Sequence, residues 1–172
     1  GWEFGAQAFV KDGEILFVMP HGDNTYMSHT AVPVGHYVPL NCGQDIYRQT
    51  EVAVRSAIRA LGLNNCAVNV DLILKDETVY VIELTGRVGA NCLPELVEIN
   101  YGVEYYKMIA SLAVGDDPIE YWNRKNAYET AGLAKMIIST DRSGVLKEIA
   151  YQGHNDPDVI QVSFFKKPGD EI

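Results

Sequence analysis

Residues 66–87, CAVNVDLILKDETVYVIELTGR, decide the fold of this chain. Two short apolar runs rich in β-branched residues flank a polar turn at 75–78, which predicts a β-hairpin with strands over 66–74 and 79–84. One acidic residue lies inside each run, Asp71 in the first strand and Glu83 in the second. A buried charge without a partner is costly, so these two carboxylates need either a partner or exposure to water.

The two acids allow two interpretations of the hairpin. Facing carboxylates repel each other unless a cation lies between them, and Mg²⁺ prefers oxygen ligands of this kind. Alternatively, each carboxylate faces water on the polar side of a half-exposed hairpin, and spacing alone does not separate the two interpretations. The next residues favour the metal site, because Arg87 and a glycine-containing turn follow Glu83 directly. An arginine fork and a glycine turn are suited to binding phosphate or carboxylate.

The first forty residues predict a second hairpin followed by a loop. Residues 2–10 alternate in hydropathy, and a Lys-Asp-Gly turn joins them to a returning strand over 14–19. Residues 20–41 are rich in Gly, Pro, His and Asn and show no helical period. We therefore expect them to form a long loop with short extended pieces.

The sequence predicts three helices. The clearest one is expected over 45–61, where apolar residues recur with helical spacing and Gly62 follows as a C-terminal cap. The stripe expected on its buried side consists of Ile46, Val52, Ala53, Ile58 and Leu61. Two shorter helices are expected over 94–99 and 103–114.

The predicted fold class is α+β: an antiparallel sheet with packed helices, plus a small β-rich lobe. From about residue 131 the chain contains three strand-like segments separated by turns, which predict that lobe. The expected organisation is therefore a main domain over 1–118, a connector over 119–130 and the lobe over 131–172.

Composition excludes several classes of function. The net charge of −9 argues against a nucleic-acid partner, because phosphate backbones bind basic surfaces. An acidic protein can still bind a polyanion through bridging metal ions. The apolar stretches are short and interrupted by charges, so we expect no membrane span. The three cysteines form no CxxC pair and no secretory leader opens the chain, which together predict a cytoplasmic protein without a disulfide framework.

Residues 70–118, VDLILKDETVYVIELTGRVGANCLPELVEINYGVEYYKMIASLAVGDDP, resemble the end of the core of the ATP-grasp superfamily. In that superfamily, an acid on one strand and a Glu-x-Asn-x-Arg segment on the next bind two Mg²⁺ ions and the ATP phosphates. The resemblance implies that Asp71 and Glu83 bind metal and that Arg87 contacts phosphate and the activated carboxylate. Thr85 stands where the family usually has Asn; its hydroxyl can still offer an oxygen to a metal, although it has no amide.

Three further segments extend the resemblance over nearly the whole chain. Residues 1–7, GWEFGAQ, resemble a strand of carboxylate–amine ligases, which implies that Glu3 contacts the ATP ribose. Residues 30–39, TAVPVGHYVP, resemble the loop before the long helix, and His36 matches a histidine near the phosphoryl-transfer site of amino-acid ligases. The segments after residue 131 resemble the C-terminal lobe of biotin-carboxylase-like and L-amino-acid-ligase-like members. His21 and His29 are expected to be ordinary loop residues.

The resemblance implies ATP-dependent ligation, with ATP and Mg²⁺ or Mn²⁺ as cofactors. A carboxylate would attack the γ-phosphate of ATP to give an acyl phosphate, which an amine then displaces. The implied partners are small-molecule carboxylate and amine substrates, and homo-oligomer formation stays open. Two alternatives are a carbamoyl-phosphate-synthase-like or biotin-carboxylase-like enzyme and a non-catalytic nucleotide-binding module in which Thr85 marks lost activity.

The family's lysine-bearing subdomain has no counterpart before Glu3, and the first predicted strand begins at residue 2. We therefore expect a fragment of a longer enzyme, whose missing N-terminal part is its partner. The isolated chain is expected to fold without catalysing the reaction.

Overall fold

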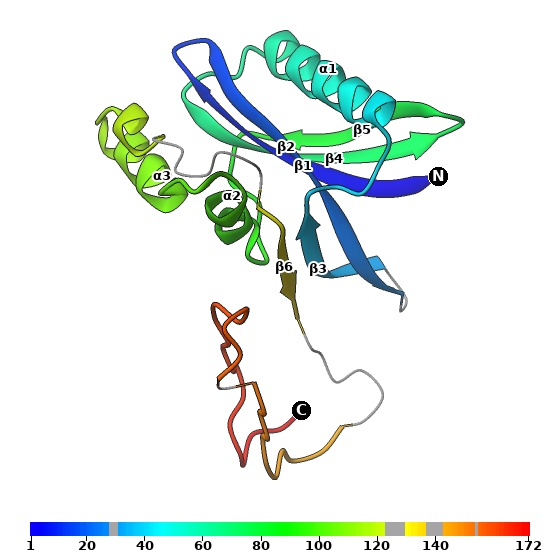
Figure 1. Ribbon diagram of the computed structural model, residues 1–172, viewed down its shortest axis with the longest axis vertical. Coiled ribbons are helices and arrows are strands. Elements are labelled where there is room, and N and C mark those ends of the chain that lie inside the picture. Colours follow the sequence, from blue (N-terminus) through cyan, green and yellow to red (C-terminus); the bar gives the residue numbers. More distant parts are fainter. Residues whose placement is uncertain (28–30, 123–129, 137–142, 154) are drawn as a thin grey trace. The chain divides into compact units, whose positions relative to one another are not determined.

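The computed structural model describes residues 1–27, 31–122, 130–136, 143–153 and 155–172 (Figure 1). The chain divides into two units, Gly1–Met136 and Ile137–Ile172. In chain order the elements are β1 (Trp2–Lys11), β2 (Glu14–Met27), β3 (Ala31–Val38), α1 (Gln44–Ala60), β4 (Cys66–Lys75), β5 (Thr78–Thr85), α2 (Leu93–Tyr101), α3 (Tyr105–Val114), the short 3-10 helix η1 (Pro118–Tyr121) and β6 (Gly132–Lys135).

The first unit is built on one six-stranded sheet in the order β5-β4-β1-β2-β3-β6. Every neighbouring pair of strands is antiparallel. β1 lies inside the sheet between β4 and β2, and its alternating side chains point to both faces. The predicted α+β class, an antiparallel sheet with packed helices, is confirmed.

Both predicted hairpins are present, and each turns through residues with positive φ. In the β1–β2 turn φ is +50° at Asp12 and +82° at Gly13; in the β4–β5 turn it is +50° at Asp76 and +61° at Glu77. Two consecutive residues in the left-handed region are typical of a two-residue turn whose twist matches that of the strands. Asn65 reinforces the first turn, because its Oδ1 accepts a hydrogen bond from Asp12 N at 2.9 Å.

Helix α1 covers one face of the sheet (Figure 1). The alternation predicted over residues 2–10 is present in β1, where Phe4, Ala6, Ala8 and Val10 are all buried on this face. They pack with Val54 and Ile58 of α1 and with alternate residues of β4. This face is therefore closed by apolar packing along much of the helix.

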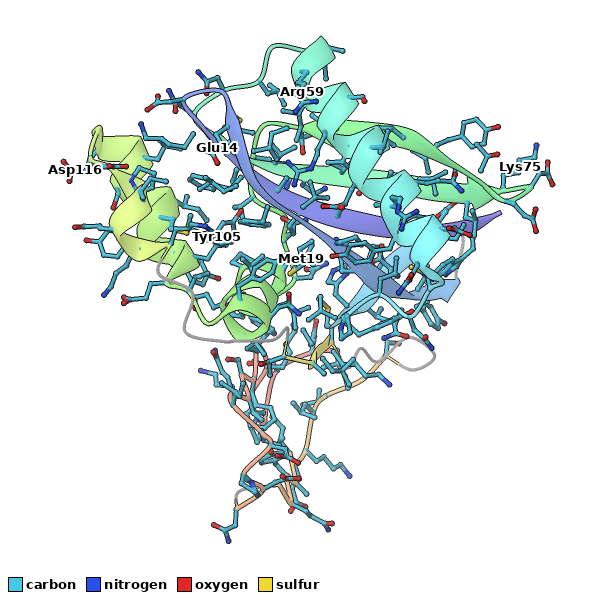
Figure 2. The ribbon with its side chains drawn as sticks, turned by 45° about the horizontal axis from the view of Figure 1, so that its top comes forward. Glu14, Met19, Arg59, Lys75, Tyr105 and Asp116 are labelled. Atoms are coloured by element: carbon cyan, nitrogen blue, oxygen red, sulfur yellow. The ribbon has the colours of Figure 1, made fainter. Side chains whose placement is uncertain are left out.

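Helices α2 and α3 pack on the other face, and they cover only part of it. The cluster there contains Met19 of β2 and Tyr105 of α3 (Figure 2). Phe9 and Phe17 lie against the ring of Tyr105 with centroid distances of 5.9 and 5.7 Å. Farther along the same strands, the side chains on this face are polar, and they form the site described below.

The expectation of a loop over residues 20–41 is wrong for most of that segment. β2 continues through Met27, and β3 returns beside it from Ala31. The segment is polar because side chains such as His21, Asp23 and His36 contact one another on the sheet. His29, which was expected in the loop, lies outside the described residues.

The buried stripe of α1 is rotated relative to the expectation. Val52 and Leu61 are 61% and 63% exposed, whereas Thr50, Val54 and Ile58 are buried. Thr50 can be buried because its hydroxyl donates to Ile46 O at 2.8 Å. Apolar periodicity could not reveal that a polar residue belonged to the buried face.

The structure differs from the expectation of a β-rich lobe over residues 131–172. β6 joins the main sheet by pairing with β3, so this predicted strand belongs to the first unit. Within 143–153 and 155–172 there is no strand, only an isolated bridge between Val145 and Glu171. Much of the expected connector, residues 123–129, lies outside the described residues. No helix in the described ranges is long and apolar enough to cross a membrane.

Candidate active site

Asp71 and Glu83 are direct cross-strand partners on β4 and β5. Both side chains are exposed, and they lie on the face that carries α2 and α3. Direct partners on an antiparallel pair have Cβ atoms about 4.5–5.5 Å apart. The register shifts immediately beside this pair, because Leu72 faces Val81 and leaves Ile82 as an extra residue in β5. Such a bulge redirects the strand next to the carboxylates.

Asn69 and Thr85 form the next pair along the same face. Asn69 Nδ2 donates to Asp71 Oδ1 at 3.3 Å, and Thr85 Oγ1 lies 3.5 Å from Asn69 O. Two carboxylates and a hydroxyl are hard oxygen ligands, so the donor set fits Mg²⁺ or Mn²⁺, while the Asn69 amide NH2 orients Asp71. Asn69 was missed by the sequence reasoning, although its spacing of two residues from Asp71 places both on one face of a strand.

Gln7 joins this polar row to the loop that follows β5. It is fully buried, and its Nε2 donates to Asn69 Oδ1 at 2.6 Å while its Oε1 accepts from Gly89 N at 3.0 Å. A Cβ on Gly89 would lie 2.7 Å from Asn69 Oδ1 and 2.8 Å from Gln7 Nε2. The glycine therefore permits the close approach of the loop to the sheet. A glutamine within an apolar strand was the sequence signal for this role.

Arg87 lies in the loop between β5 and α2, four residues after Glu83. Its side chain is exposed, and Nη1 donates to Val88 O at 2.9 Å. In the described part of the chain, it forms no ion pair with Asp71 or Glu83. A guanidinium has five N–H donors, so donors remain for an anionic ligand.

Glu3 lies on the same face of the sheet as Asp71. It is an exposed residue of β1 opposite Ile73 of β4, and both positions are two residues away from the Gly5–Asp71 pair. The structure thus brings Glu3 to the same surface as the acids, and its contact with a ribose stays a prediction.

His36 lies on β3, three strand spacings from Asp71 on β4. At about 4.8 Å per spacing the backbones are roughly 14 Å apart, so the two side chains do not share one ligand atom. His36 is buried, and its Nδ1 lies 2.6 Å from Asp23 Oδ1. The structure therefore does not bring His36 together with the predicted metal ligands.

His21 also binds Asp23, with Nδ1 2.9 Å from the same oxygen Oδ1. Burial favours the neutral carboxyl, but hydrogen bonds from His21 and His36 and their charges outweigh it and lower the pKa of Asp23 to about 2. The expectation that His21 is a loop residue is wrong, because it is a strand residue with 2% of its surface exposed. The pattern His21-x-Asp23 was the missed signal, since residues two apart in a strand share a face.

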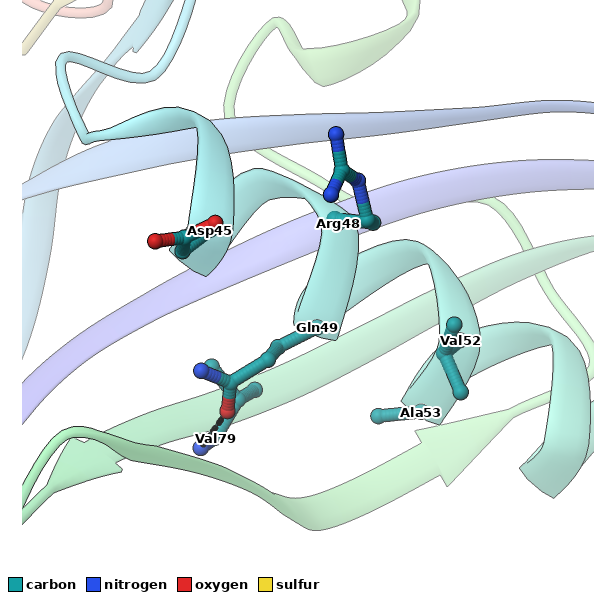
Figure 3. Close-up of a pocket in the computed structure, with 6 residues that line it drawn as sticks. All are labelled: Asp45, Arg48, Gln49, Val52, Ala53 and Val79. Carbon is teal, nitrogen blue, oxygen red and sulfur yellow. Dashed lines mark hydrogen bonds between the residues drawn. The ribbon is translucent and has the colours of Figure 1, made fainter.

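A shallow depression lies on the opposite face, between α1 and β5 (Figure 3). Gln49 bridges its two sides, because its Oε1 accepts a hydrogen bond from Val79 N at 3.2 Å. The lining residues are Asp45, Arg48, Gln49, Val52, Ala53 and Val79. None of the predicted site residues is among them, so this depression is separate from the acidic pair.

Solved structures share this fold, whereas no protein-family model and no curated protein matches the chain. A phosphoribosylglycinamide synthetase from Anaerococcus prevotii is 65% identical over the whole chain, with a TM-score of 0.96. An L-amino acid ligase from Bacillus licheniformis, 18% identical, also aligns over the whole chain with a TM-score of 0.74. An ATP-grasp superfamily protein from Archaeoglobus fulgidus aligns over 88% of the chain at 18% identity, with a TM-score of 0.53. The chain spans 44%, 43% and 42% of these three proteins.

Proposed function

This chain belongs to the ATP-grasp superfamily, and on that premise we propose that it forms the metal- and phosphate-binding part of an ATP-dependent carboxylate–amine ligase. The observation that carries the proposal is the cross-strand pair of Asp71 and Glu83 on an open sheet face. A structural pair of exposed acids would gain nothing from this arrangement, because like charges directly opposite destabilise a sheet.

Asp71 and Glu83 are the proposed ligands of Mg²⁺ or Mn²⁺, with the Thr85 hydroxyl beside them, and Asn69 orients Asp71. When bound, the metal supplies charge neutralisation at the ATP phosphates. Gln7 holds Asn69 and the loop at Gly89 in place, so the ligand row and the loop keep a constant geometry. Arg87 is the proposed contact for the charge that develops on the transferred phosphoryl group.

The proposed reaction has two steps. An oxygen of the substrate carboxylate attacks the γ-phosphorus of ATP, the bond to the bridging oxygen breaks, and ADP leaves. The amine nitrogen then attacks the acyl carbon, inorganic phosphate leaves, and the amine loses one proton. Positioning and electrostatic stabilisation supply most of the rate in phosphoryl transfer, which agrees with a site made of carboxylates and one arginine.

We propose that a lysine-bearing subdomain outside this chain forms the other side of the nucleotide-binding site. The support is that the chain spans 44% of the Anaerococcus prevotii protein while aligning over its own full length. This proposal predicts that the chain alone binds metal and lacks ligase activity. Ligation or ATP hydrolysis by the chain alone would contradict it.

Calorimetric titration tests the metal site directly. Mg²⁺ or Mn²⁺ is titrated into the chain with and without ADP, and into Asp71→Asn and Glu83→Gln variants. Glu14→Gln serves as the control, because Glu14 is exposed at the far end of β2. Loss of binding in both site variants but not in the control supports one shared site, whereas unchanged binding in either site variant contradicts it.

A non-catalytic nucleotide-binding module is the second candidate. The observation that favours it is Thr85, whose hydroxyl faces the backbone oxygen of Asn69 at 3.5 Å in place of the amide usual in the family. ATP-dependent ligase activity of a protein that carries Thr85 would rule this candidate out.

A further inference from the structure

His21 has one ring nitrogen that the fold leaves without a partner. The ring is 2% exposed, and its Nδ1 is hydrogen-bonded to Asp23. Nε2 is buried, and within the described residues no atom forms a hydrogen bond with it. Buried polar atoms nearly always have partners, and leaving one without a partner is destabilising. The orientation of the ring therefore needs a reason.

The unpartnered edge of His21 lies over Gly5. A Cβ added to Gly5 would be 2.5 Å from His21 Nε2, so the imidazole occupies the space that a side chain would fill. Gly5 is the cross-strand partner of His21 on one side and of Asp71 on the other. His21, Gly5, Asp71 and Glu83 thus form one row across four adjacent strands, and only the glycine contributes no side chain.

This row puts His21 on the same sheet face as the acidic pair. Gly5 separates His21 from Asp71 by two strand spacings, about 10 Å between backbones. The ring leans over Gly5 and so covers part of that distance. A group bound between His21 and the metal ligands would be in contact with both.

A metal ion within the histidine cluster itself is the other explanation. His21, Asp23 and His36 offer ligand atoms that all lie within 4.8 Å of one another. However, both Nδ1 atoms already share Asp23 Oδ1, at 2.9 and 2.6 Å. These hydrogen bonds satisfy the Nδ1 edges, and the unsatisfied atom is on the opposite edge of His21. The geometry therefore favours a ligand at Nε2 over an ion among the three residues.

We propose that His21 Nε2 donates a hydrogen bond to an anionic oxygen of the phosphoryl or carboxylate group that is bound beside Asp71. This inference deepens the proposed function and rests on it. Asp23 accepts from Nδ1–H, so Nε2 is a donor when both ring nitrogens carry a hydrogen. His36 binds the same carboxylate and fixes its orientation, so it is a positioning residue.

A matched pair of substitutions separates the two edges of the ring. The amide nitrogen of Asn falls near the position of Nδ1, whereas that of Gln falls near the position of Nε2. His21→Asn therefore keeps the contact with Asp23 and removes the donor over Gly5. His21→Gln keeps a donor over Gly5. A merely structural role of His21 would not distinguish these variants in this order.

The experiment titrates ADP and inorganic phosphate into the whole chain in saturating Mg²⁺, and Mg²⁺ alone in a separate arm. We expect His21→Asn to weaken phosphate or ADP binding about tenfold or more, and His21→Gln to weaken it less. Mg²⁺ binding without nucleotide should be unchanged in both. Gly5→Ala should reproduce the loss without removing any polar atom, because its methyl group displaces the ring. Thermal melting identifies any variant that fails to fold.

The outcomes distinguish this inference from the proposed function. Equal anion affinity in wild type, His21→Asn and Gly5→Ala, with normal Mg²⁺ binding, would overturn the role of His21 alone. Absence of both Mg²⁺ and anion binding in the wild type would overturn the proposed function and this inference with it. Binding of Zn²⁺ that is abolished equally by His21→Asn, Asp23→Asn and His36→Asn would show instead that the histidine cluster is a metal site.

Discussion

Gln7 and Asn69 face each other across β1 and β4, and Gln7 Nε2 donates to Asn69 Oδ1 at 2.6 Å. The other end of the same Gln7 amide accepts a hydrogen bond from Gly89 N. One buried side chain therefore connects the row of candidate metal ligands with the loop that contains Arg87. This connection makes the geometry of the loop depend on the interior of the sheet.

Replacing Gln7 with Leu should destabilise the protein and loosen the loop. The substitution leaves Asn69 Oδ1 and Gly89 N without their partner, and each unsatisfied buried group costs about 1–3 kcal/mol. Urea unfolding measures the loss, with Gln44→Leu as the control because Gln44 is exposed at the start of α1. Equal stability of the two variants would contradict the role of Gln7.

Gly89→Ala should have a similar effect for a steric reason. Its Cβ would lie 2.6 Å from Leu93 Cδ1 and 2.7 Å from Asn69 Oδ1, so either the loop or these side chains must shift. We expect a loss of about 1–3 kcal/mol, together with weaker Mg²⁺ binding. Gly144→Ala is the matched control, because no atom lies within 4 Å of a Cβ at that position. A Gly89→Ala protein with wild-type melting temperature and metal affinity would show that the close packing is unimportant.

The pH dependence of stability should report on Asp23. Its pKa is lowered from 3.8 to about 2 in the folded protein, so its contribution is fully present above pH 4 and is lost as the pH falls toward 2. The shift corresponds to about 2 kcal/mol. Asp23→Asn should remove this part of the acid destabilisation, as measured by urea unfolding between pH 2 and 5. Asp45→Asn, at an exposed site on α1, is the control variant.

Thr85→Asn tests whether the departure from the family pattern limits metal binding. An amide reaches farther than a hydroxyl and supplies a carbonyl oxygen, so Mn²⁺ affinity should rise by about tenfold. Calorimetry or electron paramagnetic resonance of Mn²⁺ measures the change, and Thr78→Asn at the other end of β5 is the control. Unchanged affinity and stoichiometry would mean that position 85 is not a metal ligand.

In the complete protein the same substitution separates the two candidate functions. Activity that rises from near zero on Thr85→Asn would favour the nucleotide-binding module with lost activity. Wild-type ligase activity that is already substantial would favour the ligase.

Local signals were enough to predict both hairpins and the position of the acids. The turns at Asp12-Gly13 and Asp76-Glu77 are set by neighbouring residues, and a tight turn determines the pairing of the strands it joins. The short β4–β5 turn was enough to predict that Asp71 and Glu83 lie opposite each other. The family pattern that contains both acids also lies within one continuous segment.

The wrong expectations came from segments whose environment is set by distant residues. Residues 20–41 were expected as a loop, because a strand that lines a polar part of the sheet has no apolar alternation to reveal it. The buried face of α1 was also predicted wrongly, because it includes Thr50 and excludes Val52. Burial there depends on how the helix packs against the sheet.

The sequence by itself determined the hairpins, the main helices and the metal-ligand candidates, because these depend on contacts between residues close in the chain. Only the tertiary structure decided that Gln7 holds Gly89, that Asp23 joins His21 to His36, and that His21 lies over Gly5 in the row of Asp71. The pairing of β1 with β4 connects residues 56 to 72 positions apart. Its register is set by burial of both sheet faces at once, which no local pattern contains.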